Sequence, residues 1–256
     1  MTGMVGALAA LLDLGEGFAW AAVLVFLRTG GAMALLPAFG EQAVPARVKL
    51  VLTLAFTAVV APAIDPQAAP QGAAPLLAEA AAGLLLGAGF RLLFLALQVA
   101  GTMAAQAVSL SQILGGAGAE PQPAIGHVLT VSGLALAASL GLHVRVAEAF
   151  LLSYDLLPPG RFPLAADAAA WGLAQVARMF ALGFTLAAPF LIASVIYNAA
   201  LGAINRAMPQ LMVSFIGAPA LTAGGLILLM LTVPGMLAVW LSVLHGFLDA
   251  PFSVPR

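Results

Sequence analysis

Long stretches of this chain are filled with hydrophobic side chains, and short groups of proline, glycine and polar residues separate them. A helix that crosses a bilayer needs about 20 mostly apolar residues, and six stretches approach or exceed that length. They are Phe18–Leu36, Val48–Ile64, Leu76–Leu114, His127–Leu152, Leu164–Ile204 and Leu211–Leu248. None of them alternates between apolar and polar residues as a strand does. The pattern therefore predicts an all-α fold of about six hydrophobic helical units and excludes a closed barrel.

Several of these units are longer than one simple crossing. Leu76–Leu114 predicts either one long tilted helix or a helical hairpin that turns near Gly87–Arg91. Two small residues at Gly83 and Gly87 are spaced so that helices can approach closely. Prolines within or at the ends of the apolar stretches favour kinks; they are Pro62, Pro189, Pro219 and Pro234. Kinked helices with small residues indicate a subunit of an assembly or a transporter.

The polar connectors give weaker information about the ends and the orientation. No Lys or Arg precedes the apolar residues Met4–Leu12, so they predict an apolar leader or a short first helix rather than a cleaved signal peptide. The first connector carries Arg47 and Lys49, whereas Asp65–Pro75 has no basic residue. The positive-inside rule then places the first connector in the cytoplasm and the N-terminus outside.

Composition supports the membrane interpretation. Of the 256 residues, 63% are hydrophobic and 7% are charged, whereas soluble domains carry roughly 25% charged residues. We expect one membrane-embedded domain over residues 1–256. The formal net charge is −1, so no basic surface is available for nucleic acid.

Candidate catalytic and metal-binding residues are few. Ser139 and His143 lie four apart and would share a helix face, and Ser132 with His245 is a conceivable intramembrane protease pair. Serines in apolar helices, however, usually bond to their own backbone or pack against neighbours. The chain has no cysteine and no pair of histidines at helical spacing. We therefore predict no catalytic, cofactor or metal site.

Six ionisable residues interrupt the apolar stretches. They are Arg28, Glu79, Arg91, Arg145, Glu148 and Arg178. An unpaired charge at the bilayer centre costs about 3 kcal/mol or more, so these side chains should face protein, a water-filled path or the interface. Arg145 and Glu148 are three apart and are predicted to pair. Arg91 and Arg178 fit snorkelling at a helix end equally well.

The polar residues Asn205–Leu211 lie between the last two apolar stretches and predict a hairpin turn. Pro209 stops helix continuation, and Asn205 is a good residue for ending a helix. Arg206 and Gln210 then offer donors to neighbouring subunits or backbone carbonyls. A plain cytoplasmic turn with a topology-setting arginine is the alternative.

Three blocks of sequence carry a family resemblance. Phe26–Pro62 contains Arg28 in the first apolar stretch, followed by Pro37, Phe39-Gly40 and Val-Pro-x-Arg. Gly141–Gly160 contains Gly-x-His, Ser-Tyr and Pro-x-Gly, and Asn198–Leu226 contains Asn-Arg-x-x-Pro-Gln-Leu and then Ile-Gly-x-Pro. In this order the blocks resemble the FliR family, the export-gate subunits of the bacterial flagellum and of related type III secretion systems.

The resemblance implies a non-enzymatic subunit of a helical export gate in the bacterial inner membrane. Its implied partners are FliP and FliQ subunits and FlhB, and unfolded flagellar substrates pass through the shared pore. It also implies that the loop between the third and fourth units plugs the pore. By position the plug residues are Ile113, Leu114, Gly115, Gly116, Ala117, Gly118, Ala119, Glu120 and Pro121. The implied intersubunit or turn contacts are Arg28, Asn205, Arg206, Pro209 and Gln210.

This loop departs from the family pattern, because relatives often have bulky residues and an Asp-Pro where this chain has glycine, alanine and Glu120-Pro121. Such a plug would seal by close backbone packing. Three alternatives stay open: a subunit of a virulence-type injectisome, a stand-alone small-solute permease and, with least support, an intramembrane hydrolase.

Overall fold

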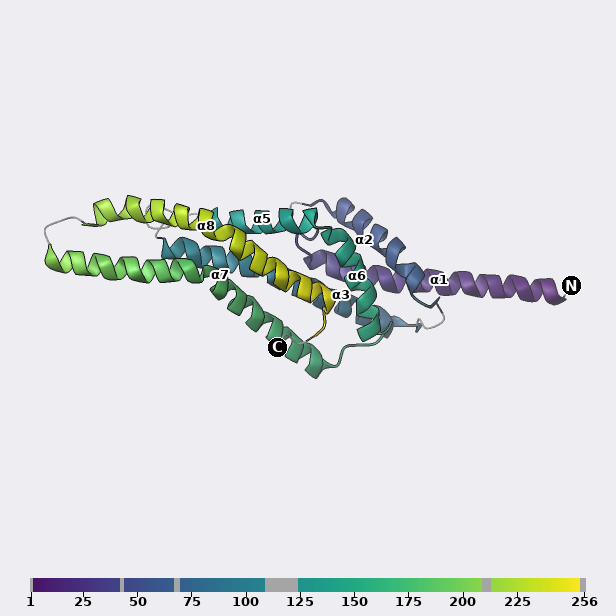
Figure 1. The fold of residues 1–256 in the computed structure, drawn as a ribbon. Coiled ribbons are helices and arrows are strands. Elements are labelled where there is room, and N and C mark those ends of the chain that lie inside the picture. Colours follow the sequence, from purple (N-terminus) through teal and green to yellow (C-terminus); the bar gives the residue numbers. More distant parts are fainter. Residues whose placement is uncertain (1, 42–43, 67–69, 109–123, 209–212, 254–256) are drawn as a thin grey trace. The chain divides into compact units, whose positions relative to one another are not determined.

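The computed structural model describes residues 2–41, 44–66, 70–108, 124–208 and 213–253, and every regular element in these residues is helical. The elements, labelled as in Figure 1, are α1 (Thr2–Leu35), α2 (Ala46–Val60), the short 3₁₀ turn η1 (Ala61–Ala63), α3 (Ala73–Ala107), α5 (Ala124–Ser139), α6 (Leu142–Leu156), α7 (Ala165–Ala207) and α8 (Val213–Asp249). The all-helical prediction is confirmed.

Most of these helices are long and apolar enough to cross a membrane. In the described part of the chain five helices meet this condition, and α5 with α6 forms a sixth, bent unit. The predicted number of about six hydrophobic units is therefore confirmed. Helices α3 and α7 contain 35 and 43 residues, which corresponds to roughly 50 and 65 Å of helix. Both exceed the roughly 30 Å thickness of a bilayer's hydrocarbon core.

Helix α3 runs without a break through residues 87–91, so the hairpin alternative for this stretch is wrong. The glycines that suggested a turn serve close packing instead. A Cβ atom added at Gly83 would collide with the backbone of Arg28 on α1, and one at Gly87 would lie 2.5 Å from the carbonyl oxygen of Ala32. Only residues without a side chain permit this backbone contact between α1 and α3.

The apolar stretch His127–Leu152 forms one bent hydrophobic unit, in which two helices, α5 and α6, meet at an angle of 77°. The break lies at Gly141, which adopts a left-handed φ of 81° and precedes the first residue of α6. Glycine takes this conformation at little cost. Ser139 is therefore the last residue of α5, whereas His143 lies in the first turn of α6, and the two do not share a helix face.

The first and last predicted boundaries also shift. Residues Met4–Leu12 belong to α1, which continues to Leu35, so they form no separate short helix. The polar break after α7 is confirmed, since α7 ends at Ala207 and α8 begins at Val213. Asn205 lies within the last turn of α7, two residues before its end, so the prediction that it terminates the helix is wrong.

The chain divides into two compact units. Unit 1 comprises Met1–Leu92, Leu140–Gln175 and His245–Arg256, and unit 2 comprises Leu93–Ser139 and Val176–Leu244. Helices α3, α7 and α8 contribute residues to both units. The single membrane domain over residues 1–256 stays a prediction.

Unit 2 has a core of aromatic and small residues. Trp240 of α8 is fully buried, and its indole N–H donates a hydrogen bond of 2.8 Å to the carbonyl oxygen of Leu93. Its ring meets Phe94 edge-on, with 4.9 Å between the ring centroids. A Cβ atom at Gly101 of α3 would collide with the backbone of Gly126 in α5. Paired glycines therefore bring these two backbones into contact.

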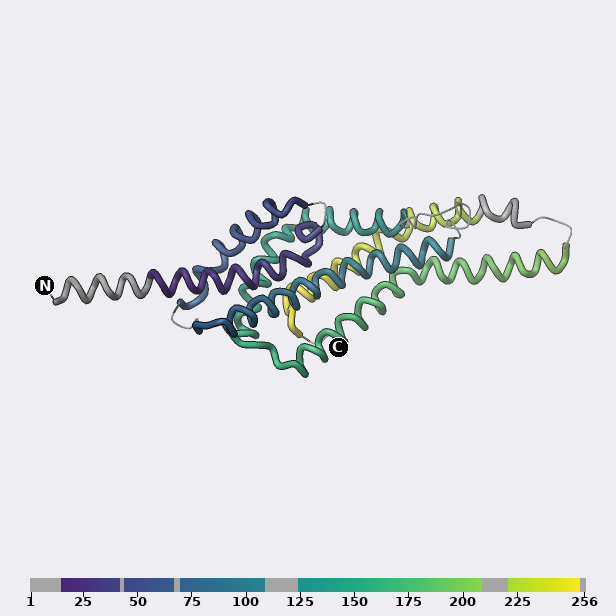
Figure 2. The backbone as a smooth tube through the Cα atoms, turned by 180° about the vertical axis from the view of Figure 1, so that it is seen from behind, coloured from purple at the N-terminus to yellow at the C-terminus, as the bar shows by residue number. Residues whose placement is uncertain are grey.

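In unit 1 helix α2 packs along α1 and also contacts α6 (Figures 1 and 2). Phe56 of α2 is the centre of an aromatic row, with Phe39 on one side and Phe150 of α6 on the other. Next to this row lies the buried polar cluster described below.

Candidate functional site

The centre of unit 1 contains a buried ion pair between Arg28 of α1 and Glu79 of α3. The Arg28 Nε atom lies 2.7 Å from Oε2 of Glu79, and one terminal guanidinium nitrogen lies 3.0 Å from Oε1. Both N–H groups donate to the carboxylate in the parallel, two-pronged geometry that strengthens such pairs. The side chains are 1% and 0% exposed, so water does not satisfy either charge.

Further hydrogen bonds surround the pair. The guanidinium also donates to the hydroxyl of Ser153 at 3.0 Å and to the carbonyl oxygen of Leu157 at 2.8 Å. The carboxylate accepts from the Tyr154 hydroxyl at 3.0 Å and from the backbone N–H of Gly160 at 2.8 Å. Among the described residues no buried side-chain nitrogen or oxygen lacks a hydrogen-bond partner.

Tyr154 contacts both members of the pair. Its hydroxyl reaches Glu79, while the Cζ atom of Arg28 stands 3.6 Å from the centroid of its ring. A cation over an aromatic face is attracted by the quadrupole of the ring, more strongly where water is excluded. The cluster therefore combines an ion pair, hydrogen bonds and a cation–π contact around one guanidinium.

The cluster joins segments that lie far apart in the sequence. Arg28 comes from α1, Glu79 from α3 and Tyr154 from α6, and Gly160 belongs to the connector between α6 and α7. Gly160 has a φ of 70°, and a Cβ atom at this position would collide with Pro70. Glycine is thus required here both by the backbone conformation and by the close approach of two connectors.

A line of threonines continues the polar contacts between α1 and α2. The hydroxyls of Thr29 and Thr57 lie 3.0 Å apart, and both side chains are buried. Thr57 also donates to the carbonyl oxygen of Thr53 one turn earlier, at 2.8 Å. Lys49 then donates to the carbonyl oxygen of Gly40 at 3.0 Å and holds the connector after α1 to the start of α2.

The residues that the sequence predicts as subunit contacts or as the pore plug are found in three situations: buried, exposed, or outside the described residues. Arg28 lies in the buried cluster of its own chain, so a subunit contact through this side chain stays a prediction that a single chain does not test. Asn205 and Arg206 are exposed near the end of α7. Pro209, Gln210 and the proposed plug Ile113–Pro121 lie outside the described residues.

The prediction for Arg145 and Glu148 is confirmed, since the two form an exposed ion pair of 3.1 Å. Arg145 also lies 3.7 Å from Asp249 at the end of α8. Within the described residues no three His, Asp or Glu side chains are grouped so that they could hold a metal ion.

Sequence reasoning identified Arg28 and Glu79 as costly charges, yet it did not pair them. Fifty-one positions separate the two residues, and no spacing rule connects positions so distant. A usable signal was present in the quoted sequence blocks, because Arg28 of the first block contacts the Ser-Tyr residues of the second. The glycine of the Pro-x-Gly motif, Gly160, donates to Glu79, the partner of Arg28. The structure thus joins two blocks that had been recognised separately.

Comparisons with known proteins agree with these blocks. The family described as Bacterial export proteins, family 1 matches residues 19–247 of the chain. The chain is 32% identical to the flagellar biosynthetic protein FliR of Caulobacter vibrioides over 90% of this chain and 95% of that protein. It is also similar to the proteins of the same name from Escherichia coli, at 27% identity over 81% of this chain and 82% of that one, and from Bacillus subtilis, at 26% identity over 86% of each.

Removing one member of the buried pair should destabilise the fold strongly. Glu79→Ala leaves the Arg28 guanidinium buried without its counter-charge, and we expect the free energy of unfolding to fall by about 3–5 kcal/mol. Arg145→Ala removes an exposed pair and should cost only about 0–1 kcal/mol. Denaturant or thermal unfolding of the purified protein in detergent measures both changes.

A double variant separates the pair from general damage to the core. Arg28→Met combined with Glu79→Leu removes both charges together and should recover part of the loss seen in Glu79→Ala. Equal destabilisation by Glu79→Ala and Arg145→Ala would show that the buried pair does not hold unit 1 together.

Proposed function

The chain belongs to the bacterial export protein family 1, the family of the flagellar biosynthetic protein FliR, and on this premise we propose that it helps form and close the pore of the flagellar export gate. It is a multi-pass, non-enzymatic membrane component of the flagellar export apparatus. The proposed cargo is unfolded flagellar protein, and the proposed location is the inner membrane at the flagellar basal body.

One observation carries this proposal: the similarity to a flagellar FliR extends over 90% of this chain and 95% of that protein. Because the alignment covers nearly all of both proteins, the similarity concerns the whole architecture and not only one part of it. The compared relatives bear a flagellar name, which favours a flagellar system over an injectisome.

We propose FliP and FliQ subunits and FlhB as the partners of the chain. The outer surfaces of its helices support a need for partners, because large apolar side chains stand out from α7 and α8. Val195, Met230 and Leu231 are each about 70% exposed, at 69%, 72% and 68%. Only 11% of the most apolar window in Leu221–Asp249 is buried within the chain. Lipid or other helices must cover this surface.

Co-purification tests the proposal against the stand-alone permease. We expect the chain produced alone to be poorly stable in detergent, and stable when produced together with the FliP- and FliQ-type proteins of the same cell. The reason is that partner helices bury the apolar and small-residue surface. A monodisperse, thermally robust monomer or homo-oligomer that binds none of these proteins would contradict the assembly.

We propose Arg206, near the end of α7, as an intersubunit contact. Its exposed position in the last turn of α7 supports this proposal, because none of its own chain's described helices covers the side chain. We expect Arg206→Ala to weaken assembly by about 1.5–3 kcal/mol, the size of a hydrogen bond to a charged group. Arg206→Lys should restore part of the yield, because lysine keeps the charge and loses the planar fork.

Quantitative pull-down of the gate complex measures this effect. Arg161→Ala is the matched control, since Arg161 is also exposed and lies in the connector between α6 and α7. Normal complex yield and normal motility of the Arg206→Ala strain would leave only the plain-turn interpretation.

We propose residues Ile113–Pro121 as the plug that closes the resting pore. Glycine lets backbones come close together, so a small-residue loop can fill a narrow constriction.

Deleting Gly115–Ala119 should leave the assembled gate leaky to ions and small solutes, while Glu120→Gln should have little effect. The measurement is a conductance or solute-leak assay on cells, with complex assembly followed in parallel. An intact complex in a tight membrane would show that this loop is not the plug, and loss of one specific solute's transport without a leak would favour a permease.

A further inference from the structure

One face of α3 in unit 2 carries polar side chains in an otherwise apolar part of the helix. From Leu93 to Ala107 the side chains with N–H or O–H groups are Gln98, Thr102 and Gln106. They follow one another at intervals of four residues, which places them on one side of the helix. In this part of α3 the two glutamines are exposed, and every other residue is buried or partly buried. We call these three residues the polar stripe of α3.

The polar stripe faces away from the helices of its own unit. At 100° per residue, Gly101 lies on one side of the stripe, and a Cβ atom there would collide with the backbone of Gly126 in α5. Val99 lies on the other side, and its Cγ1 atom is 3.0 Å from a Cβ atom built at Gly183 of α7. The positions of α3 that contact α5 and α7 therefore flank the stripe. Within the described residues neither glutamine side chain forms a hydrogen bond.

The exposed surfaces of α7 and α8 in the same unit have the opposite character. They present large apolar side chains such as Val195, Met230 and Leu231. The exposed hydroxyls of Thr185 and Ser242 donate to carbonyl oxygens of their own helices. An apolar surface is stabilised when another apolar surface covers it, whereas an amide covered in this way loses its hydrogen bonds to water. The surfaces of α7 and α8 therefore suit neighbouring helices, and the polar stripe suits a water-filled space.

We infer that the polar stripe lines the path of the cargo and forms hydrogen bonds with the backbone of the unfolded polypeptide that passes. This inference rests on the proposed function of the chain as part of the export-gate pore. Every residue of an unfolded chain except proline offers a backbone N–H donor and a carbonyl acceptor. A glutamine amide has both complementary groups, so it can bind any cargo sequence. Gln98 and Gln106 stand about 12 Å apart along the helix and give two such contacts in a row.

The absence of charge from the polar stripe suits this role. In the sequence of unit 2, residues 93–139 and 176–244, the charged residues are Glu120, Arg178 and Arg206, and none of them belongs to the stripe. A fixed charge would attract cargo segments of one sign and repel those of the other. Passage requires contacts weak enough to be released, and single amide hydrogen bonds in water meet this condition. The proposed plug begins at Ile113, shortly after Gln106 in the sequence.

The first experiment measures which positions water reaches in the assembled gate. The chain contains no cysteine, so single variants report one position each. Gln98→Cys, Gln106→Cys and Leu231→Cys are purified with the co-produced partners and treated with a charged, water-soluble methanethiosulfonate reagent. We expect both stripe positions to react roughly tenfold faster than Leu231→Cys, because only the thiolate reacts and apolar surroundings keep a thiol protonated. Ala104→Cys gives the rate for a buried position, since Ala104 is 0% exposed.

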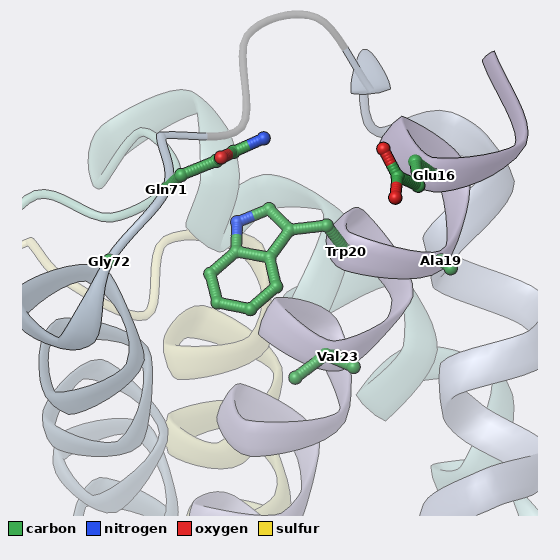
Figure 3. A pocket seen from close by; sticks show the side chains of 6 residues that line it. All are labelled: Glu16, Ala19, Trp20, Val23, Gln71 and Gly72. Atoms are coloured by element: carbon green, nitrogen blue, oxygen red, sulfur yellow. The ribbon is translucent and has the colours of Figure 1, made fainter. Parts of the chain in front are cut away.

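The second experiment tests contact with the cargo. The photo-reactive residue p-benzoylphenylalanine replaces Gln98 or Gln106, and a flagellar cargo protein with a stably folded C-terminal domain is stalled during export. Irradiation should link both positions to the cargo. Met230, exposed on α8, should link to neighbouring chains instead. Gln71 is the matched control, since this exposed glutamine lines a cavity of about 390 Å³ in unit 1 beside Trp20 (Figure 3), and it should give no link to the cargo.

The cross-link decides between the possible surroundings of the polar stripe. A cargo link at position 98 or 106, with none at position 71, supports the inference whatever the labelling rate. Slow labelling with links to a partner chain alone would overturn it and make the stripe a subunit contact. Fast labelling without a cargo link would also overturn it, because the stripe would then face water outside the path. In both cases the proposed function stands, since the cargo still stalls in an assembled gate. Export that proceeds without this chain, or a chain that binds no partner, would instead contradict the proposed function and the inference with it.

Discussion

The buried ion pair between Arg28 and Glu79 is the interaction on which the arrangement of unit 1 depends. Removing two charges from water costs several kcal/mol for each ion, and only good geometry with further hydrogen bonds compensates for that cost. Here the pair is bidentate, and Ser153, Tyr154 and the backbone of the α6–α7 connector supply the further partners. A shift of any one of these segments would remove a hydrogen bond from a charge that is buried in an apolar interior.

The packing of α1 against α3 is built around the same residues. Gly83 lies one helical turn after Glu79, and its missing side chain lets the backbone of Arg28 come into contact with α3. Shape and charge therefore impose the same pairing of the two helices: glycine permits the approach and the carboxylate fixes which residue of α1 stands opposite. In a membrane, where neighbouring helices and lipid tails are similarly apolar, such polar and steric matching is what distinguishes one helix arrangement from another.

The helices could be predicted from the sequence because a crossing requires a long apolar stretch, and six such stretches are present. Glycine was ambiguous, since the same residue permits a turn, as at Gly141, or a close contact inside a straight helix, as at Gly83 and Gly87. The role of a glycine depends on which segment packs against it, and the neighbouring positions in the sequence do not identify that segment. For Arg28 and Glu79 the cost of burial predicted a partner without identifying it, whereas Arg145 and Glu148 were paired correctly because helical spacing alone decides a contact at three residues.

The distribution of polar groups explains how a chain with so few charges suits an assembly. The Arg28–Glu79 cluster and the threonines between α1 and α2 lie inside unit 1, whereas much of α7 and α8 presents exposed valine, leucine and methionine. Polar groups with fixed partners specify the internal arrangement of unit 1 before any neighbour binds. An apolar outer surface gains little from one orientation over another, so it leaves the choice of neighbour to shape and to isolated polar groups, the role proposed above for Arg206. Different residues therefore determine the internal packing of unit 1 and form the apolar outer surface of α7 and α8. A substitution in one set need not disturb the other.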